Sequence, residues 1–357
     1  MARYDLGREE LADLLDGEPR YRVEQVWDGL YRQLVSPGEL SSLPAKLRSR
    51  LEAEEALSPA LGLVTVSRAD RGSTVKWLWE LADGARVETV LMDYGTRSTV
   101  CVSSQAGCAM GCGFCATGQA GFSRHLSVGE IVEQVVAAGA DRRDASDGRP
   151  LRPGNVVFMG MGEPMANYPR VWAAVERMHG DLGISARHIT ISTVGVVPGI
   201  RRLARESLPV NLAISLHAAN DGLRNELVPL NRRYPIAELM GAARDYLGAT
   251  GRRISFEWAL IAGVNDRASD AAELAELALP LGAHVNLIPL NPTPGYPTVG
   301  SSPAAVAAFR DRLVTIGVNA TVRRNRGTRI DAACGQLAAR AAPAATATPV
   351  ALGVGAH

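Results

Sequence analysis

Five cysteines are the residues best suited to chemistry in this chain of 357 residues. Three of them, Cys108, Cys112 and Cys115, form a Cys-x3-Cys-x2-Cys pattern. Thiolates are soft ligands that favour iron–sulfur clusters, zinc or copper(I), so three of them this close indicate a metal site. The other two, Cys101 and Cys334, lie outside the pattern.

The spacing of these cysteines separates the candidate metals. Structural zinc sites prefer paired Cys-x2-Cys units that supply four ligands, and no histidine falls inside this pattern. A [4Fe–4S] cluster normally has four cysteine ligands, so three cysteines leave one iron open to another molecule. The surrounding glycines let the backbone wrap closely around a bulky group: Gly107, Gly111, Gly113, Gly118 and Gly121. The pattern favours an iron–sulfur cluster, and a structural zinc site remains the alternative.

The overall composition excludes several classes of protein. A hydrophobic fraction of 46% argues against disorder, and five cysteines in a chain this long argue against a disulfide scaffold. No apolar run reaches the roughly 18–20 residues of a membrane span, and the N-terminus lacks the apolar region of a signal peptide. We therefore expect a cytoplasmic protein with reduced thiols and about two domains.

The basic residues are strongly biased toward arginine. Of 38 basic residues, 36 are Arg, and only Lys46 and Lys76 are lysine. Codon bias in a GC-rich genome explains this more simply than selection for phosphate contacts. The net charge of +1 argues against nonspecific coating of nucleic acid, and a local basic patch remains compatible with it.

The elements that must position these cysteines begin with a helical segment. Residues 1–60 carry an apolar stripe at helical spacing and eight basic against twelve acidic residues, a net charge of −4. Residues 61–93 contain three strand-like runs separated by turn signals at Arg71-Gly72 and Asp83-Gly84, which predicts antiparallel strands. The predicted strands are Leu61–Ser67, Thr74–Leu81 and Arg86–Met92.

From about residue 98, six short strand-like runs alternate with helical ones. The predicted strands are Thr99–Ser103, Asn155–Gly160, His188–Ser192, Asn211–Leu216, Arg253–Trp258 and Val285–Pro289. The predicted helices are Ser127–Ala138, Tyr168–His179, Pro198–Arg205, Ile236–Leu247, Ser269–Leu279 and Pro303–Ile316. This alternation predicts a parallel α/β fold, in which ligands gather at the carboxyl ends of the strands. The Ala-, Pro- and Thr-rich residues 338–357 are predicted to be a disordered tail.

Several motifs occur in an order that resembles a known family. They are the cysteine loop together with Val100–Cys108, Phe158–Pro164, Ser215–His217, Ile288–Asn291 and Ile330–Gln336. The cysteine loop resembles the radical S-adenosylmethionine (SAM) superfamily, and the full set resembles its dual-specificity RNA (adenine-C2)-methyltransferases, the RlmN/Cfr group. The resemblance implies a partial (β/α)6 TIM-like barrel over 94–337, a helical accessory RNA-binding domain over 1–60 and a small antiparallel β extension over 61–93.

The resemblance also implies two cofactors and the residues that bind them. Cys108, Cys112 and Cys115 would hold a [4Fe–4S] cluster whose fourth iron chelates SAM, with two SAM molecules used per turnover. Gly162 and Glu163 would receive the amino group of SAM, where a carboxylate beside an ammonium is physically sensible. The other implied SAM contacts are Ser192, Ser215, Leu216, His217 and Asn291.

Three further residues receive catalytic roles from the resemblance. Cys334 would accept a methyl group, a 5′-deoxyadenosyl radical would remove a hydrogen from it, and the methylene radical would add to adenine C2. Cys101 would then resolve the protein–RNA adduct by forming a disulfide with Cys334. Some base must take the C2 proton, and Glu88 occupies the family's position for that acceptor, with Cys101 as the alternative.

The expected substrates are adenine-2503 of 23S rRNA and adenine-37 of tRNA, with an electron donor such as flavodoxin and a monomeric enzyme. The basic run from Arg323 to Arg329 could grip phosphates beside the active site, and the target base must leave its stack to reach a buried cofactor. Two alternatives stay open. One is the sister activity that methylates C8, and the other is a non-catalytic zinc-binding RNA module.

Overall fold

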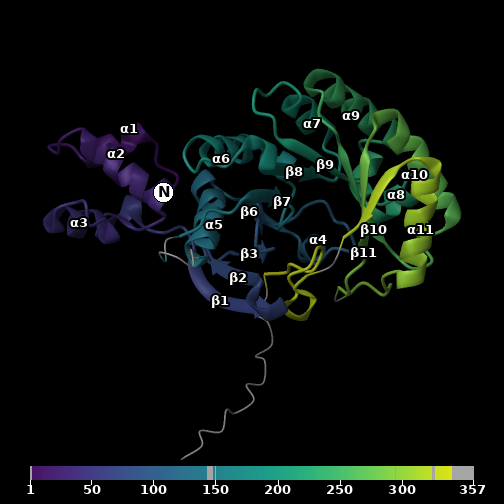
Figure 1. Cartoon of the computed structure of the whole chain (residues 1–357), viewed down its shortest axis with the longest axis horizontal. Coiled ribbons are helices and arrows are strands. Elements are labelled where there is room, and N and C mark those ends of the chain that lie inside the picture. The colour runs from purple at the N-terminus through teal and green to yellow at the C-terminus, as the bar shows by residue number, and fades with distance from the viewer. Residues whose placement is uncertain (1, 143–147, 149, 294, 324–325, 340–357) are drawn as a thin grey trace, which may run out of the picture.

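The computed structural model describes residues 2–142, 148, 150–293, 295–323 and 326–339 (Figure 1). Its main sheet has ten strands in the order β1-β2-β3-β4-β7-β8-β9-β10-β11-β12. The pairs from β1 to β4 are antiparallel, and the pairs from β4 to β12 are parallel. The strands are β1 (Gly62–Ala69), β2 (Thr74–Glu80), β3 (Arg86–Asp93), β4 (Ser98–Cys101), β7 (Asn155–Phe158), β8 (Ile189–Thr193), β9 (Asn211–Ser215), β10 (Ser255–Leu260), β11 (His284–Pro289) and β12 (Asn319–Val322).

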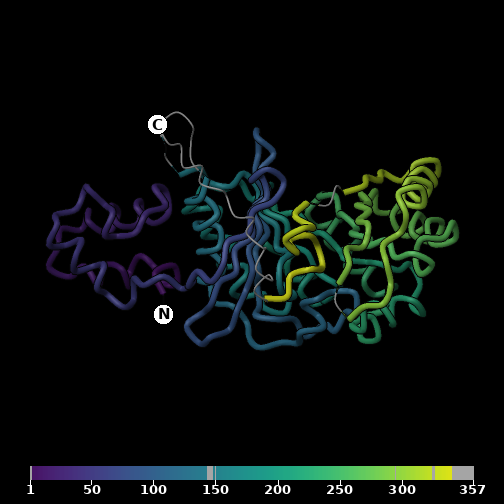
Figure 2. The backbone as a smooth tube through the Cα atoms, turned by 90° about the horizontal axis from the view of Figure 1, so that it is seen from below, coloured from purple at the N-terminus to yellow at the C-terminus, as the bar shows by residue number. Residues whose placement is uncertain are grey.

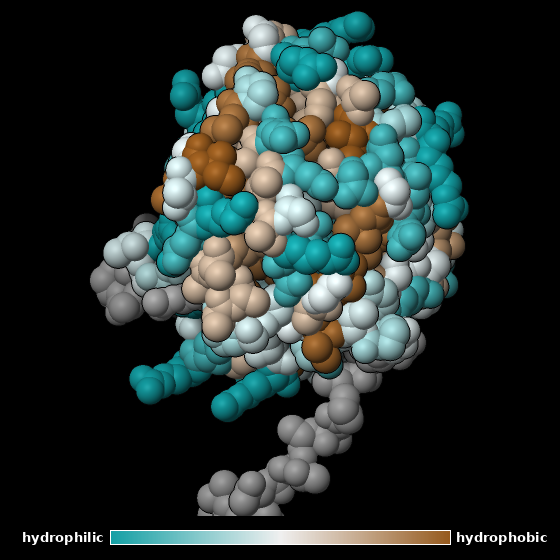
Figure 3. Space-filling view, turned by 90° about the vertical axis from the view of Figure 1, so that its right-hand side faces the viewer, coloured by the Kyte–Doolittle hydropathy of each residue, from teal (hydrophilic) through white to brown (hydrophobic). Residues whose placement is uncertain are grey.

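Helices connect the parallel strands and form the outer layer of a partial barrel (Figure 1). They are α5 (Val128–Asp141), α6 (Tyr168–Gly180), α7 (Val197–Leu203), α8 (Asp221–Leu227), α9 (Ile236–Thr250), α10 (Ala268–Ala278) and α11 (Pro303–Ile316). Local sequence sets their ends: Ser127 caps α5 by accepting the amide of Glu130. Figure 3 views the face at the right of Figure 1, where hydrophilic residues surround separate hydrophobic patches.

The helices α1 (Arg8–Leu14), α2 (Tyr21–Asp28) and α3 (Ala45–Glu52) lie at one end of the molecule (Figure 2). They are tied to the barrel helices by polar contacts as well as by packing. Trp27 Nε1 donates to Asp181 Oδ1 over 2.9 Å, and Arg177 donates to the Tyr31 hydroxyl over 2.7 Å. No helix in the described part of the chain combines the length and the apolar character that a membrane span requires.

The structure confirms the predicted parallel α/β architecture, and each of the six predicted parallel strands overlaps an observed one. A seventh parallel strand, β12, was missed, because only four residues pair and so short a run shows no clear strand pattern. The hairpin of β5 (Gln105–Gly107) and β6 (Phe122–His125), the short helix α4 (Ala116–Ala120) and helix α8 were missed as well. The predicted limits of the domains remain predictions, and residues 340–357 of the predicted tail lie outside the described residues.

Candidate active site

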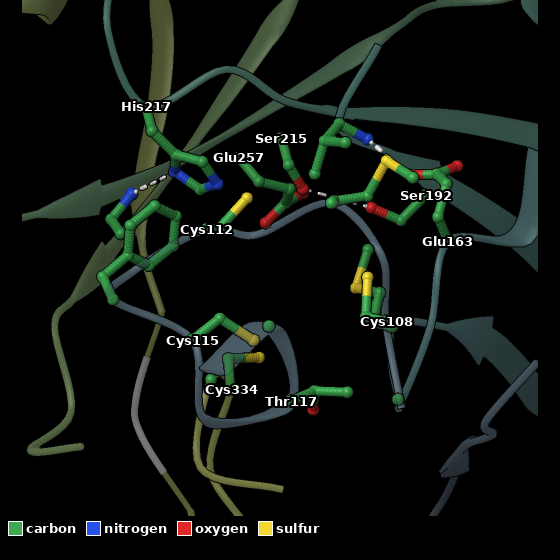
Figure 4. Close-up of a pocket in the computed structure, with 18 of the residues that line it drawn as sticks. Cys108, Cys112, Cys115, Thr117, Glu163, Ser192, Ser215, His217, Glu257 and Cys334 are labelled. Atoms are coloured by element: carbon green, nitrogen blue, oxygen red, sulfur yellow. Dashed lines mark hydrogen bonds between the residues drawn. The ribbon is translucent and has the colours of Figure 1, made fainter. Parts of the chain in front are cut away.

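A cavity of about 160 Å³ lies at the carboxyl ends of the parallel strands, where the fold class predicts a ligand site. Most of the predicted site residues line it: Cys108, Cys112, Cys115, Gly162, Glu163, Ser192, Ser215, His217, Asn291 and Cys334. Figure 4 shows four cysteine side chains around this space, three from the loop and the fourth from the C-terminal segment. Three predicted site residues are not among the described residues that line the cavity: Leu216, Cys101 and Glu88.

The cysteine loop joins β5 to α4 and is closed by its own backbone. The amide of Cys108 donates to the carbonyl of Gly121 over 2.7 Å, and the amide of Cys115 donates to the carbonyl of Cys112 over 3.1 Å. Burial raises the pKa of the Cys108 thiol to about 12 and also raises the pKa of Cys112. Both thiols therefore stay protonated unless a cation compensates the buried charge.

The loop fits the iron–sulfur cluster that its spacing predicts. Iron supplies the positive charge that lets buried thiols bind as thiolates. Gly118 lets the chain after the loop pack directly on the backbone of Cys112, since a Cβ there would lie 2.8 Å from the carbonyl oxygen of Cys112. Within the described residues, no three His, Cys, Asp or Glu side chains come close enough to hold a single metal ion together, and a [4Fe–4S] cluster does not require that, because each cysteine binds a different iron.

Glu163 follows β7 and presents a buried carboxyl group to the cavity. Its Oε1 accepts the amide of Met165 over 3.0 Å, and its Oε2 accepts the amide of Val194 over 2.9 Å. Burial raises the pKa of Glu163 to about 7, and these amides oppose the rise. Gly162 has a φ of +101°, and a Cβ there would lie 2.5 Å from Gln105 Cβ, so only glycine fits. A cationic group in the cavity would favour the ionised carboxylate.

His217 follows β9 and is held as a neutral hydrogen-bond donor. Its Nδ1 accepts the amide of Ala259 over 3.0 Å. Burial lowers the pKa of His217 to about 3, and the charge of Arg224 adds to the effect. The neutral ring must then carry its proton on Nε2, which suits binding rather than base catalysis. Nearby, the hydroxyls of Ser192 and Ser215 lie 3.4 Å apart.

The structure does not bring the side chain of Leu216 to the cavity, because it is completely buried in the core. Its backbone is also engaged: the amide donates to the carbonyl of Glu257, and the carbonyl accepts Arg224 Nε, both over 3.0 Å. Asn291 does line the cavity, and its Nδ2 donates to the carbonyl of Cys334 over 3.0 Å.

The last described segment of the chain brings Cys334 to the cysteine loop. The carbonyl of Gly335 accepts the amide of Ala116 over 2.8 Å, and the carbonyl of Leu337 accepts the hydroxyl of Thr117 over 2.6 Å. Cys101 ends β4 and is buried, and all five cysteines are free thiols. Burial raises the pKa of Cys101 to about 12; Cys334 adds to the rise and Arg323 opposes it.

Glu88 lies on β3 behind the Cys334 segment and is only 1% exposed. Its Oε1 pairs with Lys76 Nζ at 2.8 Å, and its Oε2 accepts the amide of Ala338 over 2.9 Å. The carboxylate is therefore close to the segment that carries Cys334, with both oxygens occupied.

Two charged residues line the cavity although the sequence did not predict that place for them, Glu257 and Arg323. Glu257 Oε2 accepts Asn286 Nδ2 over 2.7 Å, and burial raises the pKa of Glu257. In the sequence, Glu257 could have been noticed as an acidic residue inside an otherwise apolar strand. Arg323 belongs to the predicted phosphate-binding run, yet it lines the cavity, and the guanidinium of Arg326 stacks 4.3 Å from the ring of Tyr94. Positions 324–325 of that run lie outside the described residues.

Comparisons with known proteins agree with this geometry. The family model described as the radical SAM superfamily matches residues 102–277. A probable dual-specificity RNA methyltransferase RlmN from Chloroflexus aurantiacus is 52% identical over 94% of this chain and 92% of its own length. A second probable dual-specificity RNA methyltransferase RlmN, from Salinispora tropica, is 51% identical over 96% of this chain and 94% of its own length. The crystal structure of a radical SAM methyltransferase from Sphaerobacter thermophilus matches with a TM-score of 0.90 and 51% identity, over 95% of this chain and 100% of that one.

Proposed function

The chain belongs to the RlmN family of dual-specificity RNA methyltransferases within the radical SAM superfamily, and from that premise we propose that it makes 2-methyladenosine at adenine-2503 of 23S rRNA and adenine-37 of tRNA. It is a radical SAM RNA methyltransferase, and its family implies a [4Fe–4S] cluster and SAM. The observation that supports the proposal most is that Cys334 lines one cavity with all three loop cysteines, although it is distant from them in sequence.

The residues of the cavity divide into two binding sets. Cys108, Cys112 and Cys115 would hold the cluster through their thiolates. SAM would be held by Gly162, Glu163, Ser192, Ser215, His217 and Asn291, which all line the cavity. When bound, the cluster and SAM supply the methyl group and a 5′-deoxyadenosyl radical for chemistry that protein side chains cannot perform.

The chain itself supplies the carrier and the resolving thiol. Cys334 would carry the methyl group, and Cys101 would release the finished product by forming a disulfide with Cys334. Each thiol loses its proton in doing so. The cation of Arg323 favours the thiolate of Cys101, since its charge lowers the pKa of that thiol. Either Glu88 or Cys101 would accept the C2 proton, and both remain proposals.

The RNA must present its adenine in an unstacked form to reach Cys334. We further propose a monomeric enzyme that acts in the cytoplasm with a reductant such as flavodoxin. The five free thiols agree with a reducing compartment.

Mass mapping of the modified nucleotide tests the proposal. The anaerobically reconstituted enzyme is incubated with SAM, a flavodoxin reducing system and transcripts of 23S rRNA and tRNA, with Cys334→Ala as the control. We expect 2-methyladenosine at both positions and none with the variant. An 8-methyladenosine product would contradict the regiochemistry, and a protein that binds zinc but no iron would contradict the reaction class.

A further inference from the structure

The two lysines of this arginine-rich chain have very different surroundings. Lys46 is exposed in α3, whereas Lys76 in β2 is only 5% exposed. A buried cation costs free energy unless it is paired and hydrogen-bonded. Lys76 is therefore the lysine whose contacts call for an explanation.

Lys76 is paired with Glu88 across two neighbouring strands. Lys76 Nζ lies 2.8 Å from Glu88 Oε1, and the two side chains are 6% and 1% exposed. Leu78 is the direct partner of Glu88 in the antiparallel register, so Lys76 is its diagonal neighbour on the same face of the sheet. The opposite face packs on α5, where the Thr89 hydroxyl donates to Gln134 Oε1 over 2.9 Å. The ion pair thus lies on the face turned away from α5.

That face carries the C-terminal segment, whose yellow trace lies beside β2 and β3 in both backbone views (Figures 1 and 2). Lys76 Nζ donates to the carbonyl of Asp331 over 3.2 Å. Glu88 Oε2 accepts the amides of Ala338 over 2.9 Å and Ala339 over 3.3 Å. One ion pair therefore holds the segment before and after Cys334.

Each contact matches a full charge to a backbone dipole of the correct sign. The ammonium meets a carbonyl and the carboxylate meets two amides, and such charge-assisted hydrogen bonds are the stronger kind. The barrel holds the other side of the same segment through Asn291, Thr117 and the amide of Ala116. Those barrel contacts come from α4 and from the loop after β11, whereas the ion pair lies behind the segment.

We propose that Lys76 and Glu88 are positioning residues whose ion pair clasps the segment 331–339 and sets the place of the Cys334 thiol over the cavity. The proposal rests on the proposed role of Cys334 as methyl carrier. A thiol that must meet a methyl donor, an adenine and a second thiol needs a defined path, and small misplacements reduce rates strongly. Opening the clasp frees the segment without removing any group that lines the cavity.

Hydrogen exchange of the reconstituted full chain tests the clasp without any need for RNA or turnover. Glu88→Ala is expected to raise the exchange rate of the amides at 338–339 by at least about tenfold, and Lys76→Met that of the amides at 331–333, because each variant removes the charge-assisted anchor of that end. The matched control is Arg3→Met, which breaks a partly buried pair, Arg3–Glu133 at 3.1 Å, outside the segment. It should leave exchange in the segment unchanged. Wild-type protection in both clasp variants would overturn the proposal.

A single substitution leaves one buried charge unpaired and could prevent folding, so a double variant provides a second test. The double variant Lys76→Met/Glu88→Gln removes both charges at similar volume, and it too should exchange faster at the Asp331 end. Wild-type protection throughout 331–339 in a folded double variant would also overturn the clasp.

Kinetics then separate positioning from simple loss of structure. In Lys76→Met we expect kcat for RNA methylation to fall at least about tenfold, while the Kd for SAM stays within about twofold, because no SAM contact is removed. Faster exchange with an unchanged kcat would overturn the positioning role.

If the wild-type enzyme methylates no RNA while the exchange difference stands, the proposed function fails and the clasp survives. If Glu88→Ala stops methylation but keeps full protection, Glu88 acts in chemistry and the clasp is wrong.

Discussion

Two regions of the sheet meet the Cys334 segment from opposite sides, and they handle buried charge differently. In the parallel region, Glu163 is buried with no cationic partner among the residues that the structure describes, and its pKa is raised to about 7. In the antiparallel region, Glu88 is equally buried but paired with Lys76 at 2.8 Å. The difference teaches that the parallel region is prepared for a cationic ligand, whereas the antiparallel region satisfies its charges internally and acts on the backbone.

The geometry of each region explains this division. Parallel strands all end at one edge, so loops after β7, β8 and β9 converge on one cavity. Antiparallel neighbours instead place diagonal side chains on one face, which suits a local pair such as Lys76 and Glu88. Binding groups therefore come from the parallel region and support for the carrier segment comes from the antiparallel one.

The largest expected effect comes from the cysteine loop of the parallel region. Cys108→Ser should abolish both iron incorporation and RNA methylation, since three thiolates are the minimum set for the cluster. Iron analysis and the absorbance of the reconstituted protein measure iron incorporation, and nucleotide mass spectrometry measures RNA methylation. Lys76→Met should retain its full iron content, which separates the two regions. A Cys108→Ser enzyme that still methylates RNA would contradict the ligand assignment.

Cys101 lies where the two regions join, because β4 pairs with β3 on one side and β7 on the other. Cys101→Ala should leave the Cys334–RNA adduct unresolved, so a covalent protein–RNA species should accumulate at about one per enzyme. A denaturing gel with labelled RNA detects it. Normal multiple turnover in this variant would rule out the resolving role.

Substitution of Glu163 tests whether the parallel region binds a cationic group. Glu163→Gln should weaken SAM binding by about 10- to 100-fold, the usual range for losing a charge-assisted hydrogen bond. In the wild type, affinity should rise with pH through about 7, because only the ionised carboxylate attracts the ammonium group. Titration calorimetry at pH 6 and pH 8 measures both effects. A flat pH profile that matches the Gln variant would exclude this contact.

The same carboxyl group predicts a pH-dependent stability of known sign. Its pKa rises from 4.5 in the unfolded chain to about 7 in the fold, so the folded state holds the proton more tightly. Its contribution is complete below pH 4.5 and is lost as pH rises to about 7, by at most about 3 kcal/mol. Denaturant unfolding of the wild type and Glu163→Gln at pH 5 and pH 8 should show the variant gaining relative stability at pH 8.

The smallest effect concerns an exposed ion pair of the antiparallel region. Arg68 on β1 bonds Asp141 at 2.6 Å, and its side chain is 50% exposed. Arg68→Ala should cost about 0–1 kcal/mol of stability, because water competes for exposed charges. Hydrogen exchange at 331–339 should not change. If Arg68→Ala accelerated hydrogen exchange at 331–339 as much as Lys76→Met does, burial would not be what distinguishes the Lys76–Glu88 pair.

Local patterns predicted a large part of the molecule. Strand–helix alternation predicted the parallel architecture, and the cysteine spacing with its glycines predicted a metal-binding loop. Gly162 and Glu163 were predicted as site residues through the family resemblance. Short elements such as β12 escaped, because four paired residues carry too little periodicity. The place of Glu257 and Arg323 in the cavity was not predicted, because an acid in an apolar strand and an arginine in a basic run do not by themselves show which way the side chain faces.

The sequence by itself determined the family, the cofactors that the family implies and the parallel α/β architecture, since each depends on residue type, short spacing and local alternation. Only the tertiary structure decided that Glu88 is paired and bound to the Cys334 segment, that Leu216 faces the core, and that Lys76 reaches Asp331. These contacts join residues up to 255 positions apart, and such proximity is set by how the sheet and its last segment pack together.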